Sequence, residues 1–226
     1  MRKVTDFKVK EDIIPAPTIR RLPLYLSFLK SRRNEEKKFV SAPVIAKELC
    51  IDSSQITKDF SYIDIVGRTK IGYEITLLIR VIERFLGYHI SRKAFMVGIG
   101  NLGMALLKYK DFSNEGIEIT DGFDIDTKKI GNKINGTKIH CIDRIKGCFN
   151  NTPVEIGIIT VPADQAQEVA NTMIDCGIKA IWNFSTIPVS APDNIIIENT
   201  SIDSGLAMIK WKLNRNKPLI FKNRIL

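Results

Sequence analysis

A glycine-rich turn in the middle of the chain constrains the fold more than any other segment. Gly98, Gly100 and Gly103 form the pattern G-x-G-x-x-G. They follow the apolar run 94–97, which is typical of a buried strand, and they open a segment of helical character. In this context the first glycine permits a tight turn, the second lets a diphosphate reach the backbone, and the third lets helix and strand pack closely. The pattern predicts a dinucleotide-binding domain.

Apolar runs and helical segments alternate after this turn. We expect strands at 117–120 with 123–126, at 138–141, 155–161, 180–184 and 195–197, and a helix at 165–175. This alternation predicts an α/β, Rossmann-like fold over residues 91–200, with a doubly wound parallel sheet whose strand ends face a ligand crevice. The residues expected to contact the nucleotide are Gly98, Ile99, Gly100, Asn101, Leu102, Gly103, Asp124, Thr160, Val161, Pro162, Asn183 and Phe184.

Asp124 bears on the choice of cofactor. It follows Gly98 by 26 residues, against a usual spacing of about 20, and a longer loop at 111–116 accounts for the difference. A carboxylate here accepts hydrogen bonds from the adenosine ribose and repels a 2′-phosphate, which favours NAD(H) over NADP(H). Lys128 and Lys129 follow closely and weaken this discrimination. The alternative is an ordinary acid that caps a turn at a strand end.

Residues 1–90 read as a second domain built on three helices. One helix spans 18–31, with Pro23 expected to kink or delay it; a second starts at Ser41, and Asp52 caps a third, with Gln55 placed as in a capping box. Two short helices joined by a tight turn follow the helix-turn-helix plan. Two β-like runs around a basic tip at 65–73 resemble a wing.

This winged-helix domain carries polar and basic side chains suited to bases and phosphates. The DNA-binding candidates are Ser53, Ser54, Gln55, Thr57, Lys58, Arg68 and Lys70. A three-helix scaffold that binds no DNA is the alternative.

Charge is distributed unevenly along the chain. Residues 1–90 hold 17 Lys and Arg against 11 Asp and Glu, whereas residues 91–207 hold 11 against 14. The last 19 residues hold six basic side chains and no acidic one. This pattern favours a polyanionic partner for the N-terminal domain. The alternative is a solvated basic face.

Several classes of function are disfavoured by composition. The four cysteines are scattered without a C-x-x-C pair and only two histidines are present, so we expect neither a metal site nor a disulfide. No catalytic constellation of His, Cys or Lys is recognisable, which argues against an enzyme. No apolar run approaches the roughly 20 residues of a membrane span, and the charged N-terminus lacks a signal segment, so we expect a cytoplasmic protein that does not meet a membrane.

With these segments in place the chain resembles the Rex family of redox-sensing transcriptional repressors over nearly its whole length. In the first domain the matching segments are 20–25, 53–62 and 72–73. In the second they are 97–106, 123–126, 160–163, 166–168 and 177–184. The order of these blocks is far more specific than any single block.

The resemblance implies a homodimer that binds double-stranded operator DNA through two winged-helix domains. Each Rossmann domain would bind NAD(H), NADH binding would release the DNA, and a helix in the segment 201–226, ahead of a basic tail, would swap onto the partner subunit. Tyr109 matches a family tyrosine near the nicotinamide and joins the cofactor-binding candidates.

The chain departs from the family pattern at several positions. Thr57 stands where the recognition helix commonly carries Arg, and the wing has less glycine and aromatic character. Ser27 and Ser201 replace an Arg and an Asp that form a redox-dependent ion pair in many relatives. Because both partners are replaced together, we expect a divergent subgroup whose switch uses another contact, such as a hydrogen bond between Tyr109 and Ser201 across the dimer.

Two other functions fit parts of the sequence. One is a small NAD-dependent oxidoreductase with an N-terminal regulatory domain, for which an acid/base residue is missing. The other is a CoA- or nucleotide-binding interaction module, against which Asp124 argues because it would repel the phosphate-bearing ribose of CoA.

Overall fold

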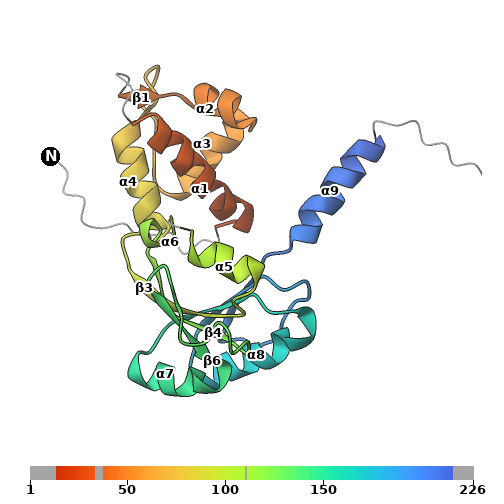
Figure 1. Ribbon diagram of the computed structural model, residues 1–226. Helices are drawn as coiled ribbons and strands as arrows, with labels where there is room; N and C mark the ends of the chain where they lie inside the picture. The colour runs from red at the N-terminus through yellow and green to blue at the C-terminus, as the bar shows by residue number, and fades with distance from the viewer. Residues whose placement is uncertain (1–13, 34–37, 110, 216–226) are drawn as a thin grey trace, which may run out of the picture. The chain divides into compact units, whose positions relative to one another are not determined.

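The protein divides into two compact units, Met1–Ile90 and Ser91–Leu226. Figure 1 shows the computed structural model, which describes residues 14–33, 38–109 and 111–215. Each unit has its own hydrophobic core, and each is described here by itself.

Within residues 14–33 and 38–90, the first unit contains four helices and a two-stranded sheet. Its elements are α1 (Ala16–Ser31), β1 (Phe39–Val40), α2 (Ala42–Leu49), α3 (Ser53–Tyr62), β2 (Tyr73–Glu74) and α4 (Ile75–Phe85). Phe60 of α3 lies at the centre of the core, with edge-on ring contacts to Tyr25 at 5.3 Å and to Tyr73 at 4.9 Å between ring centroids. The recognition-type helix α3 is therefore held to both α1 and the sheet.

Local signals in this unit were only partly correct. Asp52 caps α3 by accepting the backbone N–H of Ser54, as predicted. Pro23, expected to kink or delay the helix, does not delay it: α1 begins at Ala16 and continues past Pro23, with Tyr25 and Leu29 buried. Of the predicted capping box, the backbone N–H of Gln55 bonds the Asp52 carboxylate, whereas the Gln55 side-chain amide donates to Asp59 one turn later, at 2.8 Å.

The wing differs from the predicted pair of β-like runs. Within the run 65–73 the only pairing is a bridge between Arg68 and Gly72, while β2 pairs with β1, a strand that the sequence analysis missed. Gly72 has φ of +99°, and a Cβ there would lie 2.4 Å from the Val40 carbonyl oxygen. The backbone at position 72 passes so close to the Val40 backbone that only glycine fits, which explains the glycine at the end of the wing.

The described part of the second unit is built on a seven-stranded sheet in the order β5-β6-β4-β3-β7-β8-β9. The strands are β3 (Arg92–Val97), β4 (Ile117–Asp124), β5 (Lys133–Ile134), β6 (Thr137–Cys141), β7 (Ile156–Ile159), β8 (Ala180–Asn183) and β9 (Ile196–Asn199). All pairs are parallel except β5 with β6 at the edge. Leaving out β5, this is the doubly wound Rossmann order, so the predicted fold class is confirmed.

Helices cover both faces of this sheet (Figure 1). They are α5 (Asn101–Leu107), α6 (Asp111–Asn114), α7 (Ile145–Asn151) and α8 (Ala163–Cys176), with a 3-10 turn η1 (Ile142–Arg144) before α7. Alternate residues of β3 face opposite layers: Phe95 and Val97 pack with the α7 and α8 layer, and Ala94 and Met96 pack with the α5 layer.

A C-terminal helix, α9 (Ile202–Arg215), is present as predicted. Its apolar side chains are half or more exposed, namely Leu206, Met208, Ile209, Trp211 and Leu213. The rest of the predicted basic tail, 216–226, lies outside the described residues. Among the described helices, none is both long and apolar enough to cross a membrane.

Candidate nucleotide and nucleic-acid sites

The glycine turn lies where the sheet connections diverge. β3 pairs with β4 on one side and with β7 on the other. From β3 the chain continues to β4 and β6 on one side of the sheet, and from β7 it continues to β8 and β9 on the opposite side. Such a switch point opens a crevice at the carboxyl ends of the strands. Here a cavity of about 320 Å³ is lined by Val97, Gly98, Gly100, Asp124, Ile125, Asp126, Lys129, Ile142, Thr160, Val161, Pro162, Gln165 and Val169.

The three glycines of the motif are not all required by the fold of the turn. Gly98 has φ of +94°, and a Cβ on Gly103 would lie 2.1 Å from the Gly98 carbonyl oxygen, so both are required by the turn itself. A Cβ on Gly100 would meet no atom within 4 Å. The fold therefore does not require glycine at position 100. A diphosphate that approaches the backbone at this position does require it, because a side chain would occupy the same space.

Asp124 organises the floor of the crevice. One carboxylate oxygen accepts the Ile99 backbone N–H at 2.8 Å and lies 3.0 Å from the Lys129 ammonium, and the other oxygen accepts the Asp126 backbone N–H. Burial raises the pKa of this carboxyl, but these hydrogen bonds outweigh burial and hold the pKa below its ordinary value. Asp124 thus braces the glycine turn and presents a charge that Lys129 partly neutralises.

The structure brings part of the predicted nucleotide set together. The predicted residues that line the crevice are Gly98, Gly100, Asp124, Thr160, Val161 and Pro162. The Thr160 hydroxyl donates to the Gly98 carbonyl, which ties the loop after β7 to the glycine turn. Residues of the crevice that sequence reasoning missed include Ile125, Lys129, Ile142 and Gln165; only Lys129 had drawn attention, by its charge beside Asp124.

Other predicted residues lie elsewhere. Ile99 is buried in the core on the α5 side, and only its backbone reaches Asp124. Asn183 is fully buried: its amide donates to the Ile187 carbonyl and Asn199, and its oxygen accepts the Ser185 N–H. These bonds give Asn183 a structural role in the turn after β8.

Four further predicted residues do not line the cavity. Tyr109 is 49% exposed with its ring against Phe112, and Phe184 packs on Trp182. Asn101 is exposed and Leu102 half-buried in the first turn of α5. A contact between these four residues and the nucleotide stays a prediction.

A buried carboxylate positions α3 in the first unit. Asp59 has no exposed surface. Its oxygens accept hydrogen bonds from Thr18 Oγ1 (2.9 Å), Arg21 Nε (2.6 Å) and Nη2 (2.8 Å), Tyr25 Oη (2.6 Å) and Gln55 Nε2 (2.8 Å). Three of these four donor side chains come from α1, so the network sets the position of α3 against α1. Sequence reasoning gave Asp59 no role because its bonds to α1 join residues 34 to 41 positions apart.

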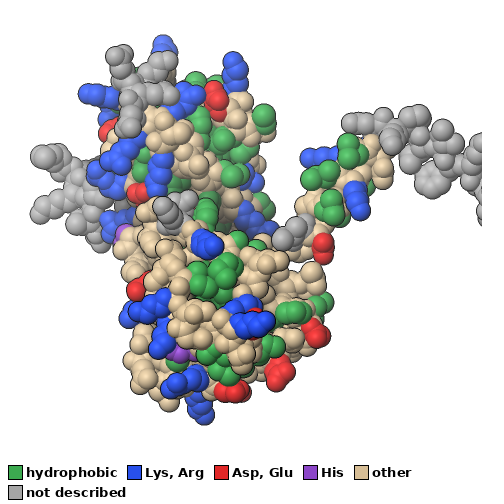
Figure 2. Space-filling view, in the orientation of Figure 1, with side chains coloured by type: hydrophobic (Ala, Val, Ile, Leu, Met, Phe, Trp, Pro, Cys, Tyr) green, Lys and Arg blue, Asp and Glu red, His purple; other side chains and the backbone are tan. Residues whose placement is uncertain are grey.

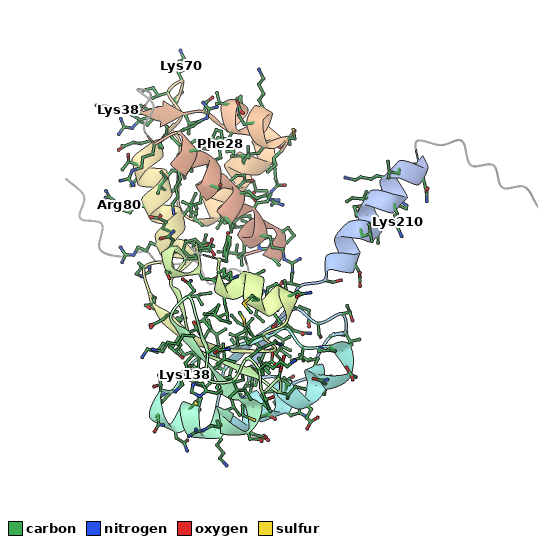
Figure 3. All side chains as sticks on the ribbon, viewed as in Figure 1. Phe28, Lys38, Lys70, Arg80, Lys138 and Lys210 are labelled. Atoms are coloured by element: carbon green, nitrogen blue, oxygen red, sulfur yellow. The ribbon has the colours of Figure 1, made fainter. Side chains whose placement is uncertain are left out.

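The predicted DNA-binding residues are all at least partly exposed. Ser54, Thr57, Lys58, Arg68 and Lys70 are exposed, and Ser53 and Gln55 are half-buried. A hollow of about 470 Å³ separates α3 from the wing and is lined partly by Thr57, Arg68 and Lys70. Lys70 projects from the wing at the same end of the unit as Lys38 (Figure 3).

Basic side chains gather on this unit in the view of Figure 2. The guanidinium carbon of Arg68, a cation of the wing, lies over the Phe39 ring, 5.3 Å from its centroid. Val66, 88% exposed, adds an apolar side chain to the wing. Basic and apolar side chains on one wing are the combination that proteins use in the minor groove.

Comparison with known proteins covers both units. Residues 13–61 match a family model described as putative DNA-binding protein N-terminus, and residues 89–187 match one described as CoA binding domain. The redox-sensing transcriptional repressor Rex of Bacteroides thetaiotaomicron is 43% identical over 90% of this chain and 93% of its own length. Rex of Treponema denticola is 40% identical over 92% of this chain and 99% of its own length.

Solved structures show the same two-unit organisation. RSP in complex with β-NAD⁺ and operator DNA superposes with a TM-score of 0.83 at 29% identity, covering 90% of this chain and 94% of RSP. RSP in complex with β-NADH superposes with a TM-score of 0.81 over 90% of this chain and 96% of RSP.

Proposed function

This chain belongs to the Rex family of redox-sensing transcriptional repressors, and we propose that it represses transcription by binding operator DNA and releasing it when NADH is bound. The observation that carries the proposal is the pairing of an exposed α3 and basic wing with a Rossmann crevice whose Gly100 faces open space. The relative RSP has been solved with both operator DNA and NAD⁺.

In the first unit α3 would enter the major groove and the wing would reach the adjacent backbone. Ser54, Thr57 and Lys58 offer hydroxyl and ammonium donors from α3, and Lys70 offers a phosphate contact from the wing. Thr57 replaces an Arg common in the family, so one bidentate contact of about 1–3 kcal/mol is missing if that Arg reads a base. We infer that phosphate contacts carry a larger share of the affinity here.

In the second unit the backbone of the glycine turn would hold the diphosphate of NAD(H). Asp124 would orient the adenosine ribose, and Lys129 would lessen the repulsion of a 2′-phosphate. When bound, the nicotinamide supplies the oxidised or reduced state that is sensed; the chain's residues bind it and transmit its presence. A coupling of this kind requires that NADH bind the DNA-incompetent arrangement more tightly than the competent one.

The dimer completes the proposal. α9 presents apolar side chains that a partner subunit would bury, consistent with an exchanged C-terminal helix. Ser27 and Ser201, which replace the family ion pair, are both exposed, and the Ser201 hydroxyl accepts the Ser204 N–H. The proposed Tyr109–Ser201 contact across the dimer would take the place of that pair.

The deciding experiment titrates a complex of the purified protein and a palindromic operator duplex at constant salt. Release by NADH at concentrations where NAD⁺ and CoA have no effect supports the proposal. DNA binding that ignores NADH and responds to CoA would replace it with the CoA-binding alternative, which the family model over 89–187 favours. Absence of operator binding with NADH still bound would contradict the repressor function.

A further inference from the structure

Three side chains of different chemistry converge on the second unit, outside the nucleotide crevice. The ligand atoms of Asp121, His140 and Cys148 all lie within 4.8 Å of one another, and each residue is half-buried. Within the described residues this is the only grouping of three or more His, Cys, Asp or Glu side chains close enough to hold a metal ion. None of the three lines the crevice, so the proposed function does not account for the cluster.

The sheet register creates this meeting. β4 pairs with β6 so that Asp121 is opposite Lys138 and Phe123 is opposite His140. Asp121 and His140 therefore point to the same face as Phe123, the face covered by α7, which supplies Cys148. The sequence spacing of 19 and eight residues follows no metal-binding motif, which is why the sequence analysis expected none.

The ligand set suits a borderline-soft divalent cation. An imidazole nitrogen, a thiolate and a carboxylate oxygen bind Zn²⁺ at about 2.0–2.3 Å, which places tetrahedral ligands roughly 3.3–3.8 Å apart. His140 Nε2 and Asp121 Oδ1 now lie 2.9 Å apart, and every pair lies within 4.8 Å. Small rotations of three side chains, without movement of the strands, would bring them to metal-binding distance.

We propose that Asp121, His140 and Cys148 form a binding site for Zn²⁺ or a cation of similar preference, with solvent as the fourth ligand. Two anionic ligands and a neutral imidazole would balance the charge of the cation. The half-burial of the three ligands leaves the fourth position open to water, as in zinc sites that are not closed.

Two other uses of the cluster fit less well. A nucleophilic cysteine needs a lowered thiol pKa, whereas burial and then the Asp121 carboxylate raise the pKa of Cys148. A hydrogen bond between His140 and Asp121 that serves stability alone would not explain why the Cys148 thiol lies beside them. A metal ion would bind all three side chains.

The test is titration of the reduced full-length protein with Co²⁺, a spectroscopic probe for zinc sites. We expect saturation at one equivalent with a thiolate-to-cobalt charge-transfer band, and displacement of that band by Zn²⁺. Zn²⁺ should also raise the melting temperature of the wild type, because it binds only the folded arrangement.

Matched variants assign the ligands. Cys148→Ser should abolish the charge-transfer band, and His140→Gln and Asp121→Asn should each weaken Co²⁺ binding at least about tenfold. Cys176→Ser, another half-buried thiol of the same unit, and His89→Gln, the other histidine, should leave the titration unchanged. Melting curves without metal show that each variant is folded.

Two outcomes would overturn the proposal. One is a wild type that gives no charge-transfer band with Co²⁺. The other is an assignment that fails in the variants, either because the band survives Cys148→Ser or because His140→Gln and His89→Gln change the affinity equally. NADH binding, measured in parallel without metal, should be the same in all variants, so failure of the metal site is distinguishable from failure of the proposed function.

Discussion

At the scale of single residues Asp59 matters most in the first unit. A fully buried carboxylate is costly unless it is paired and hydrogen-bonded. Asp59 meets this condition through Arg21 and three neutral donors, Thr18, Tyr25 and Gln55. Its removal would strand the Arg21 guanidinium, 23% exposed, and free α3 from α1.

Asp59→Asn should therefore lower the free energy of unfolding by about 3–5 kcal/mol, since it removes the charged partner of a buried pair. Asp64→Asn is the matched control: Asp64 is exposed with φ of +56°, a conformation that Asn also adopts, so the change should stay within about 0.5 kcal/mol. Chemical denaturation of both variants measures the difference. Equal effects of the two substitutions would contradict this role of Asp59.

Acid should weaken the protein through the same residue. Burial raises the pKa of Asp59, but the hydrogen bonds from Arg21, Tyr25, Gln55 and Thr18 outweigh burial and hold the pKa at about 2. Because this folded-state pKa is below the ordinary 3.8, the stabilisation is complete above about pH 4 and is lost as pH falls through 2. It amounts to about 2 kcal/mol. Unfolding free energies between pH 5 and 2 should fall less steeply in Asp59→Asn than in wild type; parallel curves would refute this.

At the scale of elements the glycine turn separates folding from binding. A Cβ at position 103 would collide with backbone, whereas one at position 100 would meet nothing. Gly103→Ala should lower the melting temperature by several degrees. Gly100→Ala should leave the melting temperature unchanged and weaken NADH binding at least about tenfold, because its methyl group would occupy the space of the diphosphate. Calorimetry and NADH titration of both variants test this, and unchanged NADH affinity in Gly100→Ala would contradict the assignment.

The wing is an element whose charge should appear in the salt dependence. Lys70 projects from its tip, and each phosphate contact contributes about 0.9 to the slope of log affinity against log salt. Lys70→Gln should weaken binding of different DNA sequences to a similar degree and lower this slope by about one. Lys179→Gln, at an exposed lysine of the other unit, should change neither. A Lys70→Gln protein with an unaltered slope would remove the wing tip from the interface.

At the scale of the whole molecule α9 would form the interface of the proposed dimer. Leu206, Ile209 and Leu213 follow one another at helical spacing and are all half or more exposed. Ile209→Asp should convert the proposed dimer to a monomer, because a carboxylate is costly to bury in an apolar interface without a partner. Lys210→Asp, one residue along and on a charged position, should remain dimeric. Sedimentation velocity distinguishes the two; a dimeric Ile209→Asp protein would show that α9 is not the interface.

The sequence by itself determined the features that depend on short-range chemistry. The glycine motif after an apolar run, the alternation of strands and helices, and the Asp52 cap each involve residues within a few positions, and the structure confirms them. The order of such blocks was also sufficient for the resemblance to the Rex family, which the relatives confirm.

Tertiary structure alone decided which polar groups bond one another. Gln55 turns to Asp59, Asn183 points inward to Asn199, and β1 rather than the wing pairs with β2. The register of β4 and β6 likewise brings Asp121 to His140. Most of these choices depend on competition among donors and acceptors far apart in the chain; Gln55 is close to Asp59 in sequence, but Asp59 itself is placed by α1. The competition is settled only when the packed core sets the distances between these groups.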